Sequence, residues 1–345
     1  MGRSNISKPT VRNLQLIKGG SFTLTIPRWW ISKQRLRKGS KLFISEDGPS
    51  LRIVSTAILS SKKRTELNLD AVEDVQHVIY MIWTYYMQGL DEIVVSSSSP
   101  ISADGKRQLR AVRMDLPGID IVREDERSVV FSVSGEFDDI TLDEVIKNMH
   151  SMVLAVQRDA VRAVVEGNIE MAREVVERES EILRIYRRVI RQIALCSMNP
   201  QVAYRSGVNN SRELITYAVL ARDLSRAVYH SLYVARHIAR YGKPLEEKTL
   251  LDIIQNMSGI AYGMSVKSVE AFLEKDIAKV LETTDNMHRV RELDEELNRK
   301  TLETVKETDK AVTILLIGRE LRRVAGYAVA MADIAANRIL GPETE

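Results

Sequence analysis

The sequence predicts a multidomain protein with a small β-rich head, an α/β middle region and an all-α C-terminal tandem of two three-helix bundles. Its first 45 residues hold ten Lys or Arg and no Asp or Glu, and they alternate apolar and polar residues between glycine turns. A mixed pattern follows, and from residue 141 onward helical periodicity continues with few breakers. Domain limits are expected at residues 8–55, 56–140 and 141–341.

Length and composition are those of a protein that buries a sizeable core. A chain of 345 residues predicts two or three domains, and 44% hydrophobic with 28% charged residues is ordinary for a soluble protein. No apolar run is long enough for a transmembrane helix, and none follows the basic N-terminal residues as a signal peptide would. The single cysteine, Cys196, forms no internal disulfide, which suits the cytoplasm.

The head is expected to contain four short strands and one short helix. Pro27 cannot continue a central strand and suits the first turn of a helix that contains Trp29 and Trp30. Alternating patterns predict strands at residues 11–16, 22–26, 41–44 and 51–54. Glycine-containing turns are expected at residues 18–21, 38–40 and 47–49.

This order of elements resembles the SpoVT/AbrB family of swapped-hairpin DNA-binding domains. The matching segments are Lys18-Gly19-Gly20-Ser21, Thr25-Ile26-Pro27, Arg37-Lys38-Gly39-Ser40 and Leu51-Arg52-Ile53. The resemblance implies that two chains exchange hairpins to complete one small β-barrel, so that the protein is a homodimer through its N-terminal domain. Physical reasoning favours the same result, because about 45 residues without a disulfide or metal build too little core to be stable alone.

The positive charge of the head indicates a polyanionic partner. The remaining residues comprise 40 basic and 47 acidic side chains, so the net charge of +3 conceals a basic head on a mildly acidic body. We expect DNA, with each neutralised phosphate adding about −0.9 to the logarithmic salt slope. The candidate DNA contacts are Arg12, Lys18, Arg28, Lys33, Arg35, Arg37 and Lys38. In the alternative interpretation the head only dimerises and its cations form a solvated face.

The middle region predicts an α/β fold without a chemical motif. Its serine run at residues 96–99 lacks the glycines and the lysine of a phosphate-binding loop, so a turn is expected there. His77 lies beside an apolar helix face and is expected to be structural. Helices are expected at residues 71–88 and 108–114, and strands at residues 55–59, 91–95, 119–123 and 128–133.

The C-terminal part is expected to consist of six long helices in two repeats, at about 141–242 and 245–341. Residues 222–227 recur in altered form at 319–324, on the third helix of each repeat. Each amphipathic helix would bury one apolar stripe, which predicts a tandem of three-helix bundles. The expected helices are residues 142–167, 168–197, 211–241, 246–273, 276–307 and 308–340.

This architecture, with an Arg-Asp/Glu-Leu-x-Arg segment on each third helix, resembles the PhoU family of phosphate-uptake regulators. Residues 71–165 extend the likeness to the archaeal subtype that joins an AbrB-like head to PhoU bundles. The resemblance implies a regulator that contacts DNA through its head and docks a phosphate transporter ATPase or histidine kinase, or senses a signal, through its bundles. The alternative is an adaptor that does not bind DNA. An enzyme is not expected, because no acid, base and nucleophile converge.

The resemblance also raises the question of a metal. PhoU proteins carry acidic clusters whose oxygens can bind divalent or trivalent cations. In this chain Tyr229, Gly326 and Arg291 interrupt the acidic pattern. No cofactor is expected with certainty, and a divalent or trivalent metal, if one binds, is expected at a single site in the first bundle rather than in a multinuclear cluster. Its candidate ligands are Glu177, Glu181 and Asp223, whose alternative role is a solvated face with pairs such as Glu174–Arg178.

Five arginines of the third helices are candidates for binding phosphate or an acidic partner. They are Arg222, Arg226, Arg319, Arg322 and Arg323. They could equally form ion pairs with Glu177, Glu181 and Asp223 across the bundle, which is the interpretation we favour from the sequence.

Overall fold

The computed structural model describes residues 9–59, 61–134 and 140–341, and the chain divides into two compact units. The first unit is the head, Met1–Glu46 with Ser50–Ser61, and the second comprises Asp47–Pro49 and Lys62–Glu345. The start expected at residue 8 lies outside the described residues. No helix among the described residues is long and apolar enough to cross a membrane.

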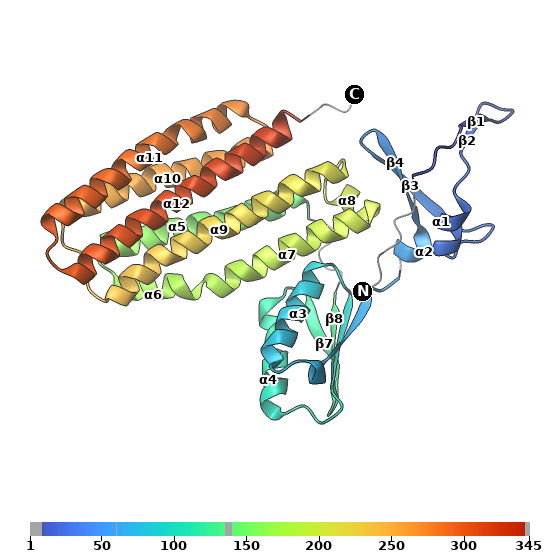
Figure 1. Ribbon diagram of the computed structural model, residues 1–345, viewed down its shortest axis with the longest axis horizontal. Coiled ribbons are helices and arrows are strands. Elements are labelled where there is room, and N and C mark those ends of the chain that lie inside the picture. Colours follow the sequence, from blue (N-terminus) through green and yellow to red (C-terminus); the bar gives the residue numbers. More distant parts are fainter. Residues whose placement is uncertain (1–8, 60, 135–139, 342–345) are drawn as a thin grey trace. The chain divides into compact units, whose positions relative to one another are not determined.

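The head contains two separate pairs of strands and two short helices (Figure 1). Within the described residues neither pair closes into the expected barrel. The strand expected at residues 55–59 is wrong beyond Ser55, because Thr56 donates both its amide and its hydroxyl to the Lys41 carbonyl and a helical turn follows. The elements are β1 (Gln15–Leu16), β2 (Phe22–Thr23), α1 (Arg28–Lys33), β3 (Leu42–Asp47), β4 (Ser50–Ser55) and α2 (Thr56–Leu59).

The middle region is a four-stranded mixed sheet that packs against two helices. The strand order is β5-β6-β8-β7, with β5 parallel to β6 and the other pairs antiparallel. The expected 119–123 and 128–133 hairpin is confirmed, whereas β5 was not anticipated. The elements are β5 (Arg64–Asn68), the 3-10 turn Leu69–Ala71, α3 (Val75–Met87), β6 (Glu92–Ser96), α4 (Ala103–Asp115), β7 (Ile119–Glu124) and β8 (Ser128–Val133).

The C-terminal part is an all-α tandem in which the long helices lie side by side (Figure 1). One hydrophobic core runs through both repeats, and α9 packs along α12 at the seam between them. The helices are α5 (Leu142–Val165), α6 (Ile169–Glu177), α7 (Glu179–Met198), α8 (Pro200–Arg205), α9 (Ser211–Tyr241), α10 (Lys248–Glu274), α11 (Ile277–Thr304) and α12 (Thr308–Ile339).

Helices α9 and α12 run antiparallel, as contacts at their two ends show. At one end Arg338 donates to the Tyr217 hydroxyl at 3.0 Å, and at the other the Tyr241 hydroxyl donates to Glu307 at 3.3 Å. Residues near the middles of both helices, around 230 and 320, therefore face each other across the seam. This pairing positions the polar cluster described below.

Local sequence explains most helix ends. Thr141 and Glu144 form the expected capping box at the start of α5, each satisfying a backbone amide of the other. The helix expected at 168–197 is instead two helices that meet at Arg178. No glycine or proline marks this break, but Arg178 turns toward α5 and pairs with Asp159 at 2.6 Å.

Two helix C-termini provide a matched pair for a stability prediction. The caps Gly242 of α9 and Lys275 of α10 both have left-handed backbones, with φ of 75° and 58°. Glycine adopts this conformation without the steric cost that other residues meet. We expect Gly242→Ala to lower the free energy of unfolding by about 1 kcal/mol and Lys275→Gly to raise it by about 0.5 kcal/mol.

Urea denaturation followed by circular dichroism would measure both changes. The side chain of Lys275 is exposed, and a Cβ at Gly242 would meet no atom within 4 Å, so neither substitution is expected to disturb packing. Stabilisation by Gly242→Ala, or destabilisation by Lys275→Gly, would contradict the assignment of strain to the backbone.

Candidate functional site

The seven candidate DNA contacts of the head are all exposed, and none forms an ion pair with a described residue. Their turns are ordered by local hydrogen bonds, such as that from the Arg37 amide to the side-chain hydroxyl of Ser40 at 2.8 Å. Arg35 has a left-handed backbone with φ of 53°. The head therefore presents uncompensated positive charge on a defined backbone, which is the arrangement that phosphate contacts require.

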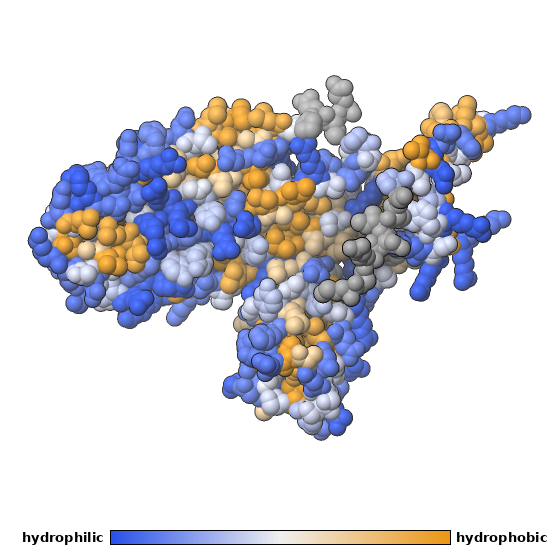
Figure 2. Space-filling model, in the orientation of Figure 1, coloured by the Kyte–Doolittle hydropathy of each residue, from blue (hydrophilic) through white to orange (hydrophobic). Residues whose placement is uncertain are grey.

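The head also exposes its apolar side chains. No side chain between residues 9 and 54 is buried, and Val11, Leu51 and Phe22 are 91%, 71% and 64% exposed. Figure 2 shows such apolar residues at the surface beside hydrophilic ones. Because burial of such side chains is the main source of stability, a single head has almost no core of its own.

A buried carboxylate lies at the centre of the α9/α12 seam. Glu320 of α12 is only 3% exposed, and its Oε2 lies 2.6 Å from Nδ1 of His230 on α9. The Nε2 of His237, two turns further along α9, lies 3.7 Å from Oε1 of Glu320. Arg319 donates to the same Oε1 at 2.6 Å. One buried carboxylate is therefore shared by two histidines of α9 and an arginine of α12.

The electrostatics of Glu320 favour its charged form. Burial by itself would raise the pKa of the carboxyl, but the interactions with His230, His237 and Arg319 outweigh burial and hold the pKa well below its ordinary value. Glu320 is thus an ionised group that is paired on both oxygens. A buried charge of this kind is stable only while its partners remain in place.

Aromatic rings surround this cluster. Tyr327 of α12 stacks on His230 with ring centroids 5.5 Å apart, and Tyr229 meets the same imidazole edge-on at 5.5 Å. The Tyr229 hydroxyl donates to the hydroxyl of Tyr233 at 2.9 Å. These rings limit the access of water to the imidazole and fix its orientation.

The five candidate arginines of the third helices do not pair as the sequence suggested. No described ion pair joins them to Glu177, Glu181 or Asp223, because Arg319 pairs with its neighbour Glu320 and Arg322 pairs with Asp294 of α11 at 3.0 Å. Arg222, Arg226 and Arg323 are exposed, and their guanidinium groups form no hydrogen bond or ion pair with a described residue. The favoured interpretation of cross-bundle pairs is therefore wrong, and three of these cations remain available.

The candidate metal ligands occupy different environments. Glu177 and Glu181 are exposed on either side of the α6/α7 break, whereas Asp223 is 6% exposed, and its burial raises its pKa despite the nearby Arg222. In the part of the chain that the structure describes, no three His, Cys, Asp or Glu side chains gather closely enough to hold a metal ion. Glu177, Glu181 and Asp223 therefore do not fit a metal centre.

Sequence reasoning missed Glu320, His230 and His237 as site residues. Glu320 was visible only as part of the repeated Arg-Asp/Glu-Leu segment, and nothing in the sequence paired it with α9. One signal was available: Ile317, Glu320 and Leu321 share a helix face by their spacing, so a charge lies within a buried stripe. Such a charge predicts a buried partner without identifying it.

Comparison with known proteins assigns the helical part to a family. A sequence model of the PhoU domain matches residues 146–238 and 254–335, together just over half of the chain. No curated protein sequence matches the chain.

Two solved structures resemble the fold at low sequence identity. The phosphate transport system regulatory protein PhoU from Streptococcus pneumoniae superposes with a TM-score of 0.50 at 17% identity, covering 58% of this chain and 94% of that one. PhoU from Pseudomonas aeruginosa superposes with a TM-score of 0.51 at 18% identity, covering 58% and 96%. With both repeats matched in sequence and the tandem bundle matched in structure, this chain belongs to the PhoU domain family.

Proposed function

We propose that this protein regulates phosphate transport through its tandem PhoU bundles. Membership of the PhoU domain family is the observation that carries the proposal. The bundles would dock a phosphate transporter ATPase or a histidine kinase, and the exposed arginines Arg222, Arg226 and Arg323 are the candidate contacts for an acidic surface on that partner. In this proposal the head comprises residues 8–55, the α/β middle region residues 56–140 and the PhoU bundles residues 141–341.

Uptake of radiolabelled phosphate by host cells would test this role. We expect cells that lack the protein to lose the normal adjustment of uptake to external phosphate, and complementation with the full chain to restore it. The expected effect is a change of several-fold in uptake rate between phosphate-rich and phosphate-poor media. Identical adjustment with and without the protein would contradict the proposal.

The head is proposed to pair with a second copy and to bind DNA. The exposed apolar side chains of the head support this pairing, since two heads could bury them against each other and complete the barrel. The acid-free surface supports contact with phosphates. The alternative adaptor function shares the dimer but lacks the DNA, so oligomeric state does not separate the two functions and DNA binding does.

Fluorescence anisotropy with DNA from upstream of the protein's own gene, across a salt series, would test DNA binding. We expect log Kd to rise steeply with log salt, and the slope to fall by about 0.9 for each phosphate contact that is removed. A variant with Arg12→Ala, Arg28→Ala and Arg37→Ala is expected to lose most of the affinity.

A matched variant controls for net charge. Arg240→Ala, Lys248→Ala and Lys306→Ala removes three exposed cations from the helical body and should leave DNA affinity unchanged. Sedimentation velocity should show the same oligomer for all three proteins. If the wild type fails to bind even at low salt, or if both variants lose affinity equally, the head is not a DNA reader and the adaptor function is favoured.

A further inference from the structure

A groove beside α12 is lined by positively charged side chains and by a glycine. Its volume is about 500 Å³, within the range of small-molecule sites, and it is lined by Met287 and Asp294 of α11 together with Arg319, Arg322, Arg323, Gly326, Tyr327 and Ala330 of α12. Three guanidinium groups and one carboxylate thus line it. Arg291, which is exposed, shares the face of α11 that carries Met287 and Asp294, by helical spacing.

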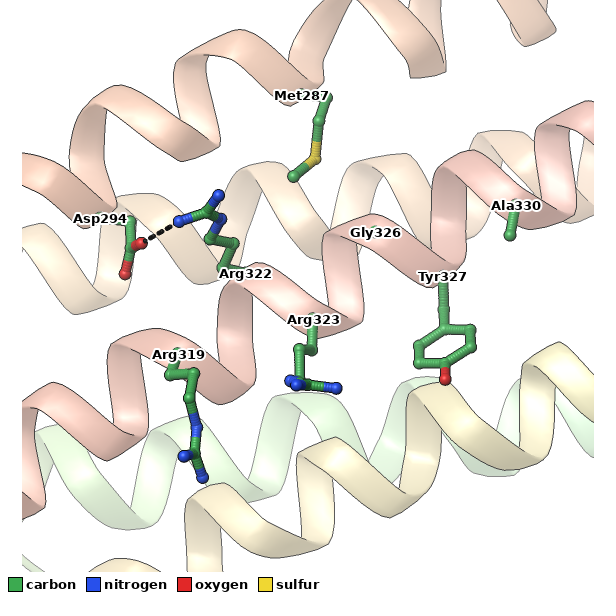
Figure 3. A pocket seen from close by; sticks show the side chains of 8 residues that line it. All are labelled: Met287, Asp294, Arg319, Arg322, Arg323, Gly326, Tyr327 and Ala330. Carbon is green, nitrogen blue, oxygen red and sulfur yellow. Dashed lines mark hydrogen bonds and ion pairs between the residues drawn. The ribbon is translucent and has the colours of Figure 1, made fainter.

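Gly326 leaves the groove open between two arginines. A Cβ at this position would meet no atom within 4 Å, so the space above the helix is empty. Arg322 and Arg323 lie one turn before Gly326, and Figure 3 shows Arg322 directed toward α11 while Arg323 and Tyr327 lie on the side of α9. A ligand above Gly326 could therefore be approached by a guanidinium from each side.

The charges of the groove are only partly neutralised. Arg322 pairs with Asp294 at 3.0 Å and Arg319 pairs with Glu320, whose charge is already shared with two histidines. Arg323 forms no hydrogen bond or ion pair with a described residue. The groove therefore has a surplus of positive charge, and the planar guanidinium is suited to bidentate contact with phosphate oxygens.

We propose that this groove binds a small phosphate-bearing anion with at least two negative charges, held by Arg323 and Arg322 above Gly326. The positive charge of the groove is the reason to expect an anionic ligand. The choice of phosphate rather than another oxyanion rests on the proposed function. Free orthophosphate and a condensed phosphate share this chemistry. The apolar side chains of Met287 and Ala330 would cover the less polar side of a larger phosphate compound.

Isothermal titration calorimetry of the full chain would test the proposal, with orthophosphate, pyrophosphate and sulfate as separate probes at constant ionic strength. We expect pyrophosphate or orthophosphate to bind at one site per chain and sulfate to bind at least tenfold more weakly. Tighter binding of pyrophosphate would identify a condensed phosphate as the ligand, and the reverse order would identify orthophosphate. Equal binding of orthophosphate, pyrophosphate and sulfate would show that the groove attracts anions without selectivity, and would overturn the proposal.

Substitutions at Gly326 locate the site without removing an existing contact. Gly326→Glu places a carboxylate within reach of Arg322 and Arg323, at i+4 and i+3, and should weaken binding at least tenfold. Gly326→Ala and Gly326→Gln control for the loss of glycine and for side-chain size, and Gly326→Ala should change affinity less than threefold. Arg323→Ala should weaken binding at least tenfold, and Arg240→Ala, outside the groove, should not.

Circular dichroism and thermal unfolding would show that each variant is folded. If binding survives Gly326→Glu and Arg323→Ala in folded protein, the groove is not the site. Absence of binding in the wild type would overturn the anion site and leave phosphate-transport regulation standing, since uptake in cells is measured independently of any bound anion.

Discussion

Replacing Glu320 by alanine is expected to lower the free energy of unfolding by about 3–5 kcal/mol. The carboxylate is 3% exposed and is paired with His230, with Arg319 and, at 3.7 Å, with His237. Its removal leaves the two histidines in the α9/α12 seam without their acidic partner. Because this seam joins the two repeats, the loss should appear in the unfolding of the whole tandem bundle.

The isosteric Glu320→Gln variant separates charge from shape. It keeps the side-chain volume and one acceptor oxygen, so we expect a smaller loss of about 2 kcal/mol. Asp333→Asn is the matched control, since Asp333 is an exposed acid on the same helix and should change stability by less than about 0.5 kcal/mol. Urea denaturation of the three variants and the wild type would measure these differences. Equal stability of Glu320→Gln and wild type would show that the buried charge contributes nothing.

The stability difference between wild type and Glu320→Gln is expected to depend on pH, in the direction set by the lowered pKa of Glu320. The pKa of Glu320 lies lower in the folded chain than its ordinary value of 4.5, so the folded state binds its proton less readily than the unfolded state. Its stabilisation is therefore complete above that value and is lost as pH falls below it. We expect the gap between wild type and Glu320→Gln to narrow as the pH falls below about 4.5. A gap that widens below about pH 4.5 would contradict the lowered pKa of Glu320.

The helices were predictable because their signals are local. The expected limits 211–241 coincide with α9, where Asn210 caps the first turn and Gly242 ends the last. The break at Arg178 was not predictable, since it depends on Asp159 of another helix rather than on a glycine or proline. The same distinction explains the site: the exposed cations of the head could be read from the sequence, whereas the pair His230–Glu320 joins residues on helices 90 positions apart.

In the head, the strands are shorter than the sequence pattern predicts. Its turns and its short helix after Pro27 follow from glycine and proline positions, but the strands expected at 11–16 and 22–26 shorten to Gln15–Leu16 and Phe22–Thr23. Apolar alternation predicts a strand on the assumption that its apolar face is covered. Here those side chains are exposed, so the local pattern has no surface to pack against within one chain. Within one chain the strands are therefore short.

Two buried arginines of α7 connect the α/β middle region to the helical bundle. Arg187 donates to the Asp115 carbonyl at 3.4 Å and lies over the Trp83 ring, and Arg191 is the more deeply buried of the two. Arg191 of α7 is 4% exposed, and its Nη1 donates to the Tyr86 carbonyl at 2.9 Å and to the Leu90 carbonyl at 2.7 Å. Its Nη2 lies 3.7 Å from Asp91. The guanidinium thereby satisfies the backbone that follows α3, where Gly89 approaches Leu195 so closely that a Cβ would lie 2.9 Å from its Cδ2.

Replacing Arg191 by methionine should therefore lower the free energy of unfolding by about 2 kcal/mol and uncouple the middle region from the bundle. Methionine fills a similar volume, but it leaves the Leu90 carbonyl without its arginine donor, at about 1–3 kcal/mol, while the Tyr86 carbonyl keeps the Gly89 amide as a donor at 3.0 Å. Arg184→Met is the control, because Arg184 is an exposed residue of the same helix. Differential scanning calorimetry should show separate transitions for the Arg191→Met variant and unchanged unfolding for the control. A single transition at the wild-type temperature would mean that apolar packing, rather than this arginine, holds the two parts together.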